Sequence, residues 1–131
     1  MNGPGASRLI LIVEDNDKNL KLARDVLQYN GFRTLDATTG EDGVIQAREQ
    51  RPDLILMDIA LPGIDGVEAT RQIKADSETA AIPIVALTAS VMQTDRARFE
   101  AAGFAGLIPK PIDVLTFSDE VAGYCRVGSE P

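Results

Sequence analysis

Groups able to handle phosphate and a metal ion stand directly after four apolar segments of the chain. In chain order they are Glu14, Asp15, Asp58, Thr88 and Lys110. Carboxylates gathered in one cleft repel one another, and a bound cation or proton relieves the repulsion. Magnesium suits such a cleft because it takes oxygen ligands and needs only one or two carboxylates besides phosphate oxygens. With a lysine and a hydroxyl to hold phosphoryl oxygens, the set predicts phosphoryl transfer to a carboxylate nucleophile.

The lack of histidine and the single cysteine exclude several other catalytic mechanisms. The sequence contains no histidine and a single cysteine, Cys125. Serine–histidine and cysteine–histidine nucleophilic pairs are therefore excluded, as is an imidazole general base. One cysteine also excludes an internal disulfide and a multi-cysteine zinc site. A carboxylate nucleophile needs none of these groups, because a carboxylic acid ordinarily needs no base to deprotonate it at neutral pH.

The elements that must position these groups alternate along the chain. Short apolar runs predict five strands, at 8–13, 32–37, 53–58, 82–87 and 104–108. Apolar residues three or four apart, with capping residues before them, predict five helices: between Asn16 and Gly31, from Thr39 through 41–50, over 66–75 and 93–102, and from Asp113 to about Arg126. Such alternation predicts an α/β fold, a doubly wound parallel sheet of five strands with helices on both faces. The carboxyl ends of its strands share one edge, where ligands bind.

Size and charge set the class of protein. A chain of 131 residues with 44% apolar content predicts one domain with a real core. The net charge of −7 disfavours nucleic-acid binding. No apolar run approaches the ~18 residues that cross a membrane, and residues 1–7 lack a charged or long apolar leader. We therefore expect a cytoplasmic protein without nucleic-acid or membrane partners.

Four motifs in fixed order resemble the receiver domain of two-component response regulators, the CheY-like domain. They are Val13-Glu14-Asp15-Asn16, Leu56-Met57-Asp58 with Leu61-Pro62-Gly63-Ile64-Asp65-Gly66, Leu87-Thr88-Ala89, and Lys110-Pro111. The stretches 13–22 and 52–59 look like single-domain cell-division regulators of the DivK type. The resemblance spans residues 8–126 and implies a flavodoxin-like sheet with strand order 2-1-3-4-5. Residues 1–7 and 127–131 are then expected to be tails around one receiver domain.

The resemblance implies an acceptor and a metal site. Asp58 would accept a phosphoryl group from the phosphohistidine of a histidine kinase or a histidine phosphotransfer domain. Asp15 would bind Mg²⁺, or Mn²⁺ in its place, next to Asp58. Glu14 would assist through water, and the backbone carbonyl of Ala60 would be a further ligand. The Lys110-Pro111 bond is expected to be cis, a form open in practice only to bonds that precede proline.

The resemblance also implies a switch. Thr88 would move to bond the phosphoryl group and Lys110 would pair with it, which reshapes the face of the fourth helix, fifth strand and fifth helix where a downstream protein binds. Receivers usually carry Tyr or Phe three residues before the lysine, and here that position is Leu107. The phosphorylation chemistry is expected to survive this change, but the usual aromatic switch is not supported. Ala89 and Ser90 are expected to set the lifetime of the phosphate by controlling access of water.

The expected function is a phosphorylation-controlled signalling switch in a bacterial two-component system or phosphorelay. It is not expected to be a turnover enzyme, although it takes part in its own phosphotransfer and autodephosphorylation. Ala60 stands where a haloacid-dehalogenase-type phosphatase needs a second aspartate. Two alternatives stay open. One is a constitutive scaffold receiver that switches little with phosphate, which Leu107 favours. The other is a receiver excised from a hybrid histidine kinase.

Overall fold

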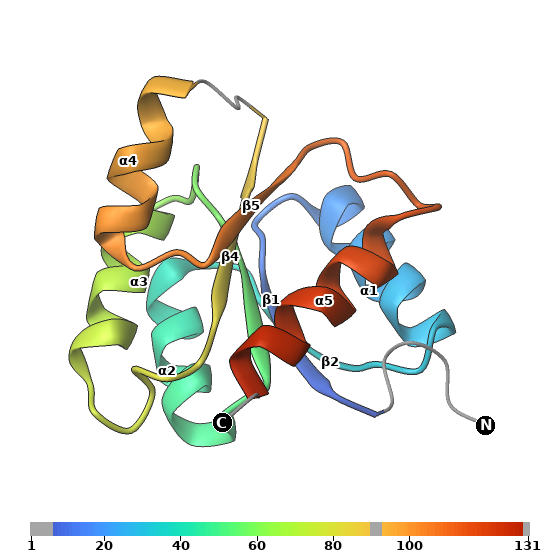
Figure 1. Cartoon of the computed structure of the whole chain (residues 1–131), viewed down its shortest axis with the longest axis horizontal. Helices are drawn as coiled ribbons and strands as arrows, with labels where there is room; N and C mark the ends of the chain where they lie inside the picture. Colours follow the sequence, from blue (N-terminus) through green and yellow to red (C-terminus); the bar gives the residue numbers. More distant parts are fainter. Residues whose placement is uncertain (1–6, 90–92, 130–131) are drawn as a thin grey trace.

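Strands and helices alternate from β1 to α5 in the computed structural model, which describes residues 7–89 and 93–129 (Figure 1). The strands are β1 (Leu9–Val13), β2 (Arg33–Ala37), β3 (Leu54–Asp58), β4 (Ile84–Thr88) and β5 (Gly106–Pro109). The helices are α1 (Asp17–Tyr29), α2 (Gly40–Gln50), α3 (Gly66–Ala75), α4 (Gln93–Ala102) and α5 (Phe117–Ser129). The strands form one parallel sheet in the order β2-β1-β3-β4-β5, which confirms the predicted fold and strand order.

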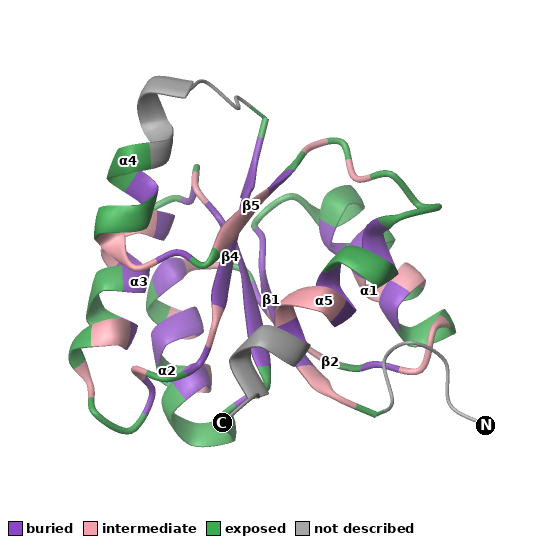
Figure 2. Cartoon of the chain, viewed as in Figure 1, coloured by how far each residue is buried: buried purple, intermediate pink, exposed green. Residues whose placement is uncertain are grey.

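Helices cover both faces of the sheet. α1 and α5 pack on one face and α2, α3 and α4 on the other (Figure 1). Successive side chains of a strand point to opposite faces, so Ile10 and Ile12 of β1 join the first layer while Leu11 and Val13 join the second. The central strands β1, β3 and β4 are almost wholly buried, as their unbroken apolar sequences require (Figure 2).

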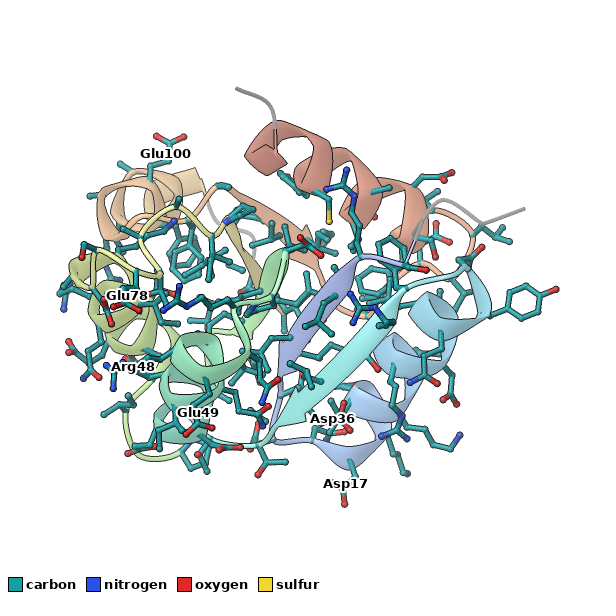
Figure 3. All side chains as sticks on the ribbon, turned by 90° about the horizontal axis from the view of Figure 1, so that it is seen from below. Asp17, Asp36, Arg48, Glu49, Glu78 and Glu100 are labelled. Carbon is teal, nitrogen blue, oxygen red and sulfur yellow. The ribbon has the colours of Figure 1, made fainter. Side chains whose placement is uncertain are left out.

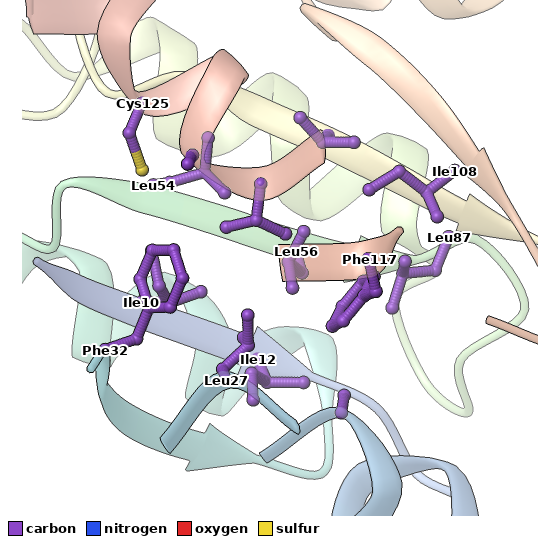
Figure 4. Close-up of a cluster of buried hydrophobic side chains, with 14 of the residues drawn as sticks. Ile10, Ile12, Leu27, Phe32, Leu54, Leu56, Leu87, Ile108, Phe117 and Cys125 are labelled. Atoms are coloured by element: carbon purple, nitrogen blue, oxygen red, sulfur yellow. The ribbon is translucent and has the colours of Figure 1, made fainter. Parts of the chain in front are cut away.

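The cluster under α5 holds this helix on the sheet. The first residue of α5, Phe117, is fully buried and so is Cys125 further along the helix. The cluster also includes Leu56 and Ile108 (Figure 4). α5 contains Gly123, which disfavours a helix, so its stability comes from this packing. The helix runs to Ser129 instead of ending near Arg126 as predicted. No proline stands between these two positions to interrupt its hydrogen bonds.

α1 and α2 start after their predicted caps, whereas α5 starts at Phe117 and not at Asp113, which was predicted to cap it. The side chains of Asn16 and Thr39 accept hydrogen bonds from the backbone amides of Asn19 and Asp42, both at 3.0 Å. Asp113 caps a turn that precedes α5: its carboxylate accepts from the amide of Leu115 at 2.9 Å. Ser7, predicted to belong to the N-terminal tail, is tied to the body because its amide donates to the carbonyl of Gly31 at 2.9 Å. The remainder of that predicted tail and residues 130–131 lie outside the described residues.

β4 and β5 start two residues later than predicted, and the other three strands start one residue later. β4 begins at Ile84 instead of residue 82, because the amide of Ile82 closes a turn onto the carbonyl of Thr79 and Pro83 has no amide to donate. β5 begins at Gly106 instead of residue 104, because the amide of Phe104 donates to the carbonyl of Phe99 and so closes α4. In both cases a turn hydrogen bond takes the amide that a strand would have used.

Charged side chains such as Glu49, Glu78 and Glu100 lie on the outside of the molecule (Figure 3). Within the described ranges 7–89 and 93–129, no helix is both long and apolar enough to cross a membrane.

Candidate functional site

The carboxyl ends of β1, β3, β4 and β5 bring the five predicted groups to one edge of the sheet. β1 leads into Glu14 and Asp15, Asp58 is the last residue of β3, and Thr88 is the last residue of β4. Lys110 follows β5 directly. In the sheet register, Asp58 pairs with Leu87, the residue before Thr88, and Thr88 pairs with Pro109, the residue before Lys110. Parallel pairing therefore places these side chains beside one another.

Three carboxylates form a cluster at this edge. One carboxylate oxygen from each of Glu14, Asp15 and Asp58 lies within 4.8 Å of the others. Glu14 is only 1% exposed and Asp58 only 3%, whereas Asp15 is exposed. Buried carboxylates without enough opposite charge raise the free energy of the site. The all-oxygen donor set fits a hard divalent cation such as Mg²⁺.

Lys110 supplies the positive charge that the cluster does have. Its Nζ lies 2.9 Å from Oε1 of Glu14 and 3.1 Å from Oδ1 of Asp58, and its side chain is 16% exposed. Burial by itself would lower the pKa of Lys110, but its hydrogen bonds to Glu14 and Asp58 outweigh burial and the pKa is raised. The ammonium group therefore stays protonated at neutral pH. The Lys110-Pro111 peptide bond is cis, as the resemblance predicted.

The pKa of Glu14 is raised in this cluster. Its burial raises the pKa of its carboxyl above the ordinary value of 4.5, and the neighbouring Asp58 raises it further. The hydrogen bond from Lys110 and the one from the amide of Asn16, at 3.1 Å, act in the opposite direction. A bound cation would relieve the same repulsion that raises this pKa.

The backbone holds Asp58 in place from the side of the β3–α3 loop. Oδ1 of Asp58 accepts a hydrogen bond from the amide of Ala60 at 3.1 Å. Gly66, the first residue of α3, passes so close behind the strand end that a Cβ there would overlap the carbonyl oxygen of Asp58. Only glycine lets α3 begin at this distance from the acceptor. Asp65 caps α3 by accepting from the amide of Glu68 at 2.9 Å.

A cavity of about 340 Å³ opens beside Asp58. Its lining includes the predicted residues Asp58, Thr88, Ala89 and Lys110. Ser90, predicted to influence the lifetime of a phosphate, lies outside the described residues. Thr88 is buried and lines this space, which is large enough for a phosphoryl group. The geometry thus combines a fixed carboxylate, a protonated amine, a hydroxyl and a place for a cation.

The comparison with protein families decides the identity. The profile of the response regulator receiver domain matches residues 10–122. This chain belongs to the response regulator receiver family. The DivK polar-differentiation response regulator of Brucella anthropi is 43% identical over 115 residues, which cover 88% of this chain and 94% of that protein. The receiver is therefore of the DivK type, as its motifs predicted.

Solved receivers agree in fold. The receiver domain of a sensor histidine kinase from Pseudomonas aeruginosa, with a magnesium ion coordinated in its active-site cleft, is 36% identical with a TM-score of 0.84, over 92% of this chain and 99% of that one. A chemotaxis response regulator of Vibrio cholerae is 23% identical with a TM-score of 0.86, over 90% and 98% of the two chains. The second likeness concerns the fold alone.

Sequence reasoning missed part of this receiver's cavity. Asp65, Val67, Arg98 and Phe99 also line it. The strand-end pattern could not find Arg98 and Phe99, because they lie inside α4 and not after a strand. α4 places them in the wall of the cavity at the strand ends. Asp65 stood in a quoted motif, but its sequence position indicated only a helix cap. The predicted roles of the site residues, including the carbonyl of Ala60 as a ligand, stay predictions.

Proposed function

We propose that this receiver accepts a phosphoryl group on Asp58 from a phosphohistidine of a histidine kinase or a histidine phosphotransfer domain, in the cytoplasm. The observation that carries the proposal is the placement of Asp58: it is 3% exposed, lies 3.1 Å from the ammonium of Lys110 and borders a cavity of about 340 Å³. A carboxylate fixed beside a cation and open only to a cavity is suited to in-line attack on phosphorus.

The reaction follows from these positions. A carboxylate oxygen of Asp58 forms a bond to phosphorus while the bond between phosphorus and the donor imidazole nitrogen breaks, and its electron pair stays on the imidazole. Lys110 holds phosphoryl oxygens by charge, and the hydroxyl of Thr88 donates to one of them. Glu14, Asp15, Asp58 and the Ala60 carbonyl would hold Mg²⁺, with Mn²⁺ as the alternative. When bound, the ion neutralises charge on the phosphoryl oxygens.

No general base is needed for this step, which agrees with a chain that has no histidine. The protein is then a phosphoacceptor that takes part in its own phosphotransfer and in the later hydrolysis, and not a turnover enzyme.

Exposed apolar side chains support a protein as the donor. The exposed Leu22 of α1 and the half-buried Ile112 line a recess that includes Lys110, and Leu115 nearby in the sequence is 86% exposed. The acidity of the chain favours protein partners over nucleic acid.

Intact mass spectrometry tests the proposal. After incubation with phosphoramidate or acetyl phosphate and Mg²⁺, the wild-type protein should gain the mass of one phosphoryl group. The gain should disappear when the divalent cation is chelated, because the acceptor site would lose its counter-charge. If the mass stays unchanged with both small donors and with phosphorylated histidine phosphotransfer domains, the proposal is wrong.

The α4-β5-α5 face is the proposed output surface. A recess of about 250 Å³ there is lined by Phe99, Phe104, Gly106, Leu107 and Tyr124, among others. Leu107 stands where receivers usually carry an aromatic residue, which favours the second candidate function, a constitutive scaffold. We expect the backbone amide shifts of Gly106, Leu107 and Tyr124 to change in NMR spectra when Asp58 is saturated with phosphate. Shifts that stay constant on this face would favour the scaffold.

A further inference from the structure

The phosphoacceptor cavity has a cationic residue that the strand ends do not supply. Arg98 lies on α4 and lines the same cavity as Asp58, Thr88 and Lys110. It is exposed, so its side chain is at the outer wall while Thr88 and Asp58 are buried at the inner wall. The cavity volume of about 340 Å³ leaves room for a phosphoryl group between these walls.

α4 is anchored in a way that fixes the backbone of Arg98. The next residue, Phe99, is buried and its ring meets that of Phe104 edge to face, with centroids 5.7 Å apart. Phe99 also lines the cavity. The buried aromatic pair holds the backbone next to Arg98, and Arg98 itself lines the cavity.

Charge supplies the reason for a second cation. A phosphoryl group adds about 1.5 to 2 negative charges and three strong acceptor oxygens. The ammonium of Lys110 is already shared between Glu14 and Asp58, at 2.9 and 3.1 Å. Asp65 adds a further carboxylate to the wall. A guanidinium offers a planar fork of N–H donors that matches two phosphoryl oxygens at once.

We propose that Arg98 binds the phosphoryl group on Asp58 from the α4 side of the cavity. Lys110 then contacts the group from the β5 side, and the two cations divide its oxygens between them. This inference rests on the proposed function, since it concerns the same phosphorylated residue.

Beryllium trifluoride, a stable mimic of a phosphoryl group on aspartate, provides the test. Its affinity in the presence of Mg²⁺ is measured by ¹⁹F NMR titration for wild type, Arg98→Gln and Arg98→Lys. Arg98→Gln should bind about fivefold more weakly, a loss at the upper end of the range for an exposed ion pair. Arg98→Lys should fall between, because it keeps the charge and loses the fork. The affinity for Mg²⁺ alone should not weaken, since Arg98 cannot bind a cation.

The matched control is Arg71→Gln on α3. Arg71 is also exposed, and its Nη1 lies 2.9 Å from Oε1 of Glu68, outside the residues that line the cavity. Equal affinities of wild type and Arg98→Gln would overturn the role of Arg98 and leave the proposed function standing, and so would an equal loss in Arg71→Gln. Absence of binding to the wild-type protein with Mg²⁺ would overturn the proposed function as well.

Discussion

Asp58→Asn is expected to abolish phosphoryl incorporation from small donors, with a loss of at least about 100-fold in the amount of phosphoprotein formed, as for other residues that act at the reacting atom. The amide keeps the shape of the side chain and can still accept from the amide of Ala60. It has no nucleophilic carboxylate oxygen. Intact mass after incubation with acetyl phosphate and Mg²⁺ measures the effect.

The same variant should be more stable than wild type when no divalent cation is present. Asp58 raises the pKa of the buried Glu14, so the negative charge of Asp58 is unfavourable next to Glu14. In the variant, Lys110 still has Glu14 as an ion-pair partner. The variant loses the 3.1 Å ion pair between Asp58 and Lys110, but it also loses the repulsion among three carboxylates within 4.8 Å of one another. We expect a net gain of about 1 kcal/mol in the free energy of unfolding. Added Mg²⁺ should stabilise wild type more than the variant.

Asp65→Asn is the control for this experiment. Asp65 lines the same cavity, and asparagine still caps α3. This variant should gain one phosphoryl group as wild type does. A phosphoryl group found on the Asp58→Asn protein would contradict the assignment of Asp58 as the acceptor, and peptide mapping would then identify the true one.

Lys110→Ala is expected to lower the free energy of unfolding by about 3 kcal/mol at neutral pH without divalent cation, because it leaves buried carboxylates without their partner. The ammonium now bonds both Glu14 and Asp58, which are 1% and 3% exposed. Urea unfolding of the two proteins at equal ionic strength measures the difference.

The pH dependence of this loss separates charge from packing. The pKa of Glu14 is already raised by burial, and loss of the Lys110 hydrogen bond raises it further. An acid with a raised pKa in the folded state costs stability as the pH rises from its ordinary value, 4.5, through that raised pKa. The defect of Lys110→Ala should therefore shrink as the pH falls from neutral toward 5. Saturating Mg²⁺ should shrink it at neutral pH.

Two further variants complete this comparison. Lys110→Met keeps much of the aliphatic stem, so it should show the same dependence on pH and Mg²⁺ with a smaller packing loss. Lys21→Ala removes an exposed ammonium that pairs with Asp25 on α1, and its stability should respond to neither variable beyond the wild-type response. A Lys110→Ala defect that is constant in pH and unaffected by Mg²⁺ would show that Lys110 contributes packing only.

Much of the fold was predictable from local patterns. The predicted bounds of the helices at 66–75 and 93–102 agree with α3 and α4, and Asn16 and Thr39 cap their helices as predicted. The two strand starts that differed most from the prediction, at residues 82 and 104, depended on which partner an amide found in a turn. That choice is made by neighbouring backbone, so the apolar pattern alone could not reveal it.

The sequence by itself determined the core of the site, because parallel strands end at one edge and the residues after them must meet there. Glu14, Asp15, Asp58, Thr88 and Lys110 were identified in this way, and the structure brings them together. The tertiary structure alone decided that one ammonium bridges two buried carboxylates and that Arg98 enters the cavity from α4. Those contacts depend on how closely the helices pack against the strand ends. The periodicity of a sequence predicts which face of a helix is buried, but it does not predict the distance or angle between that helix and the sheet.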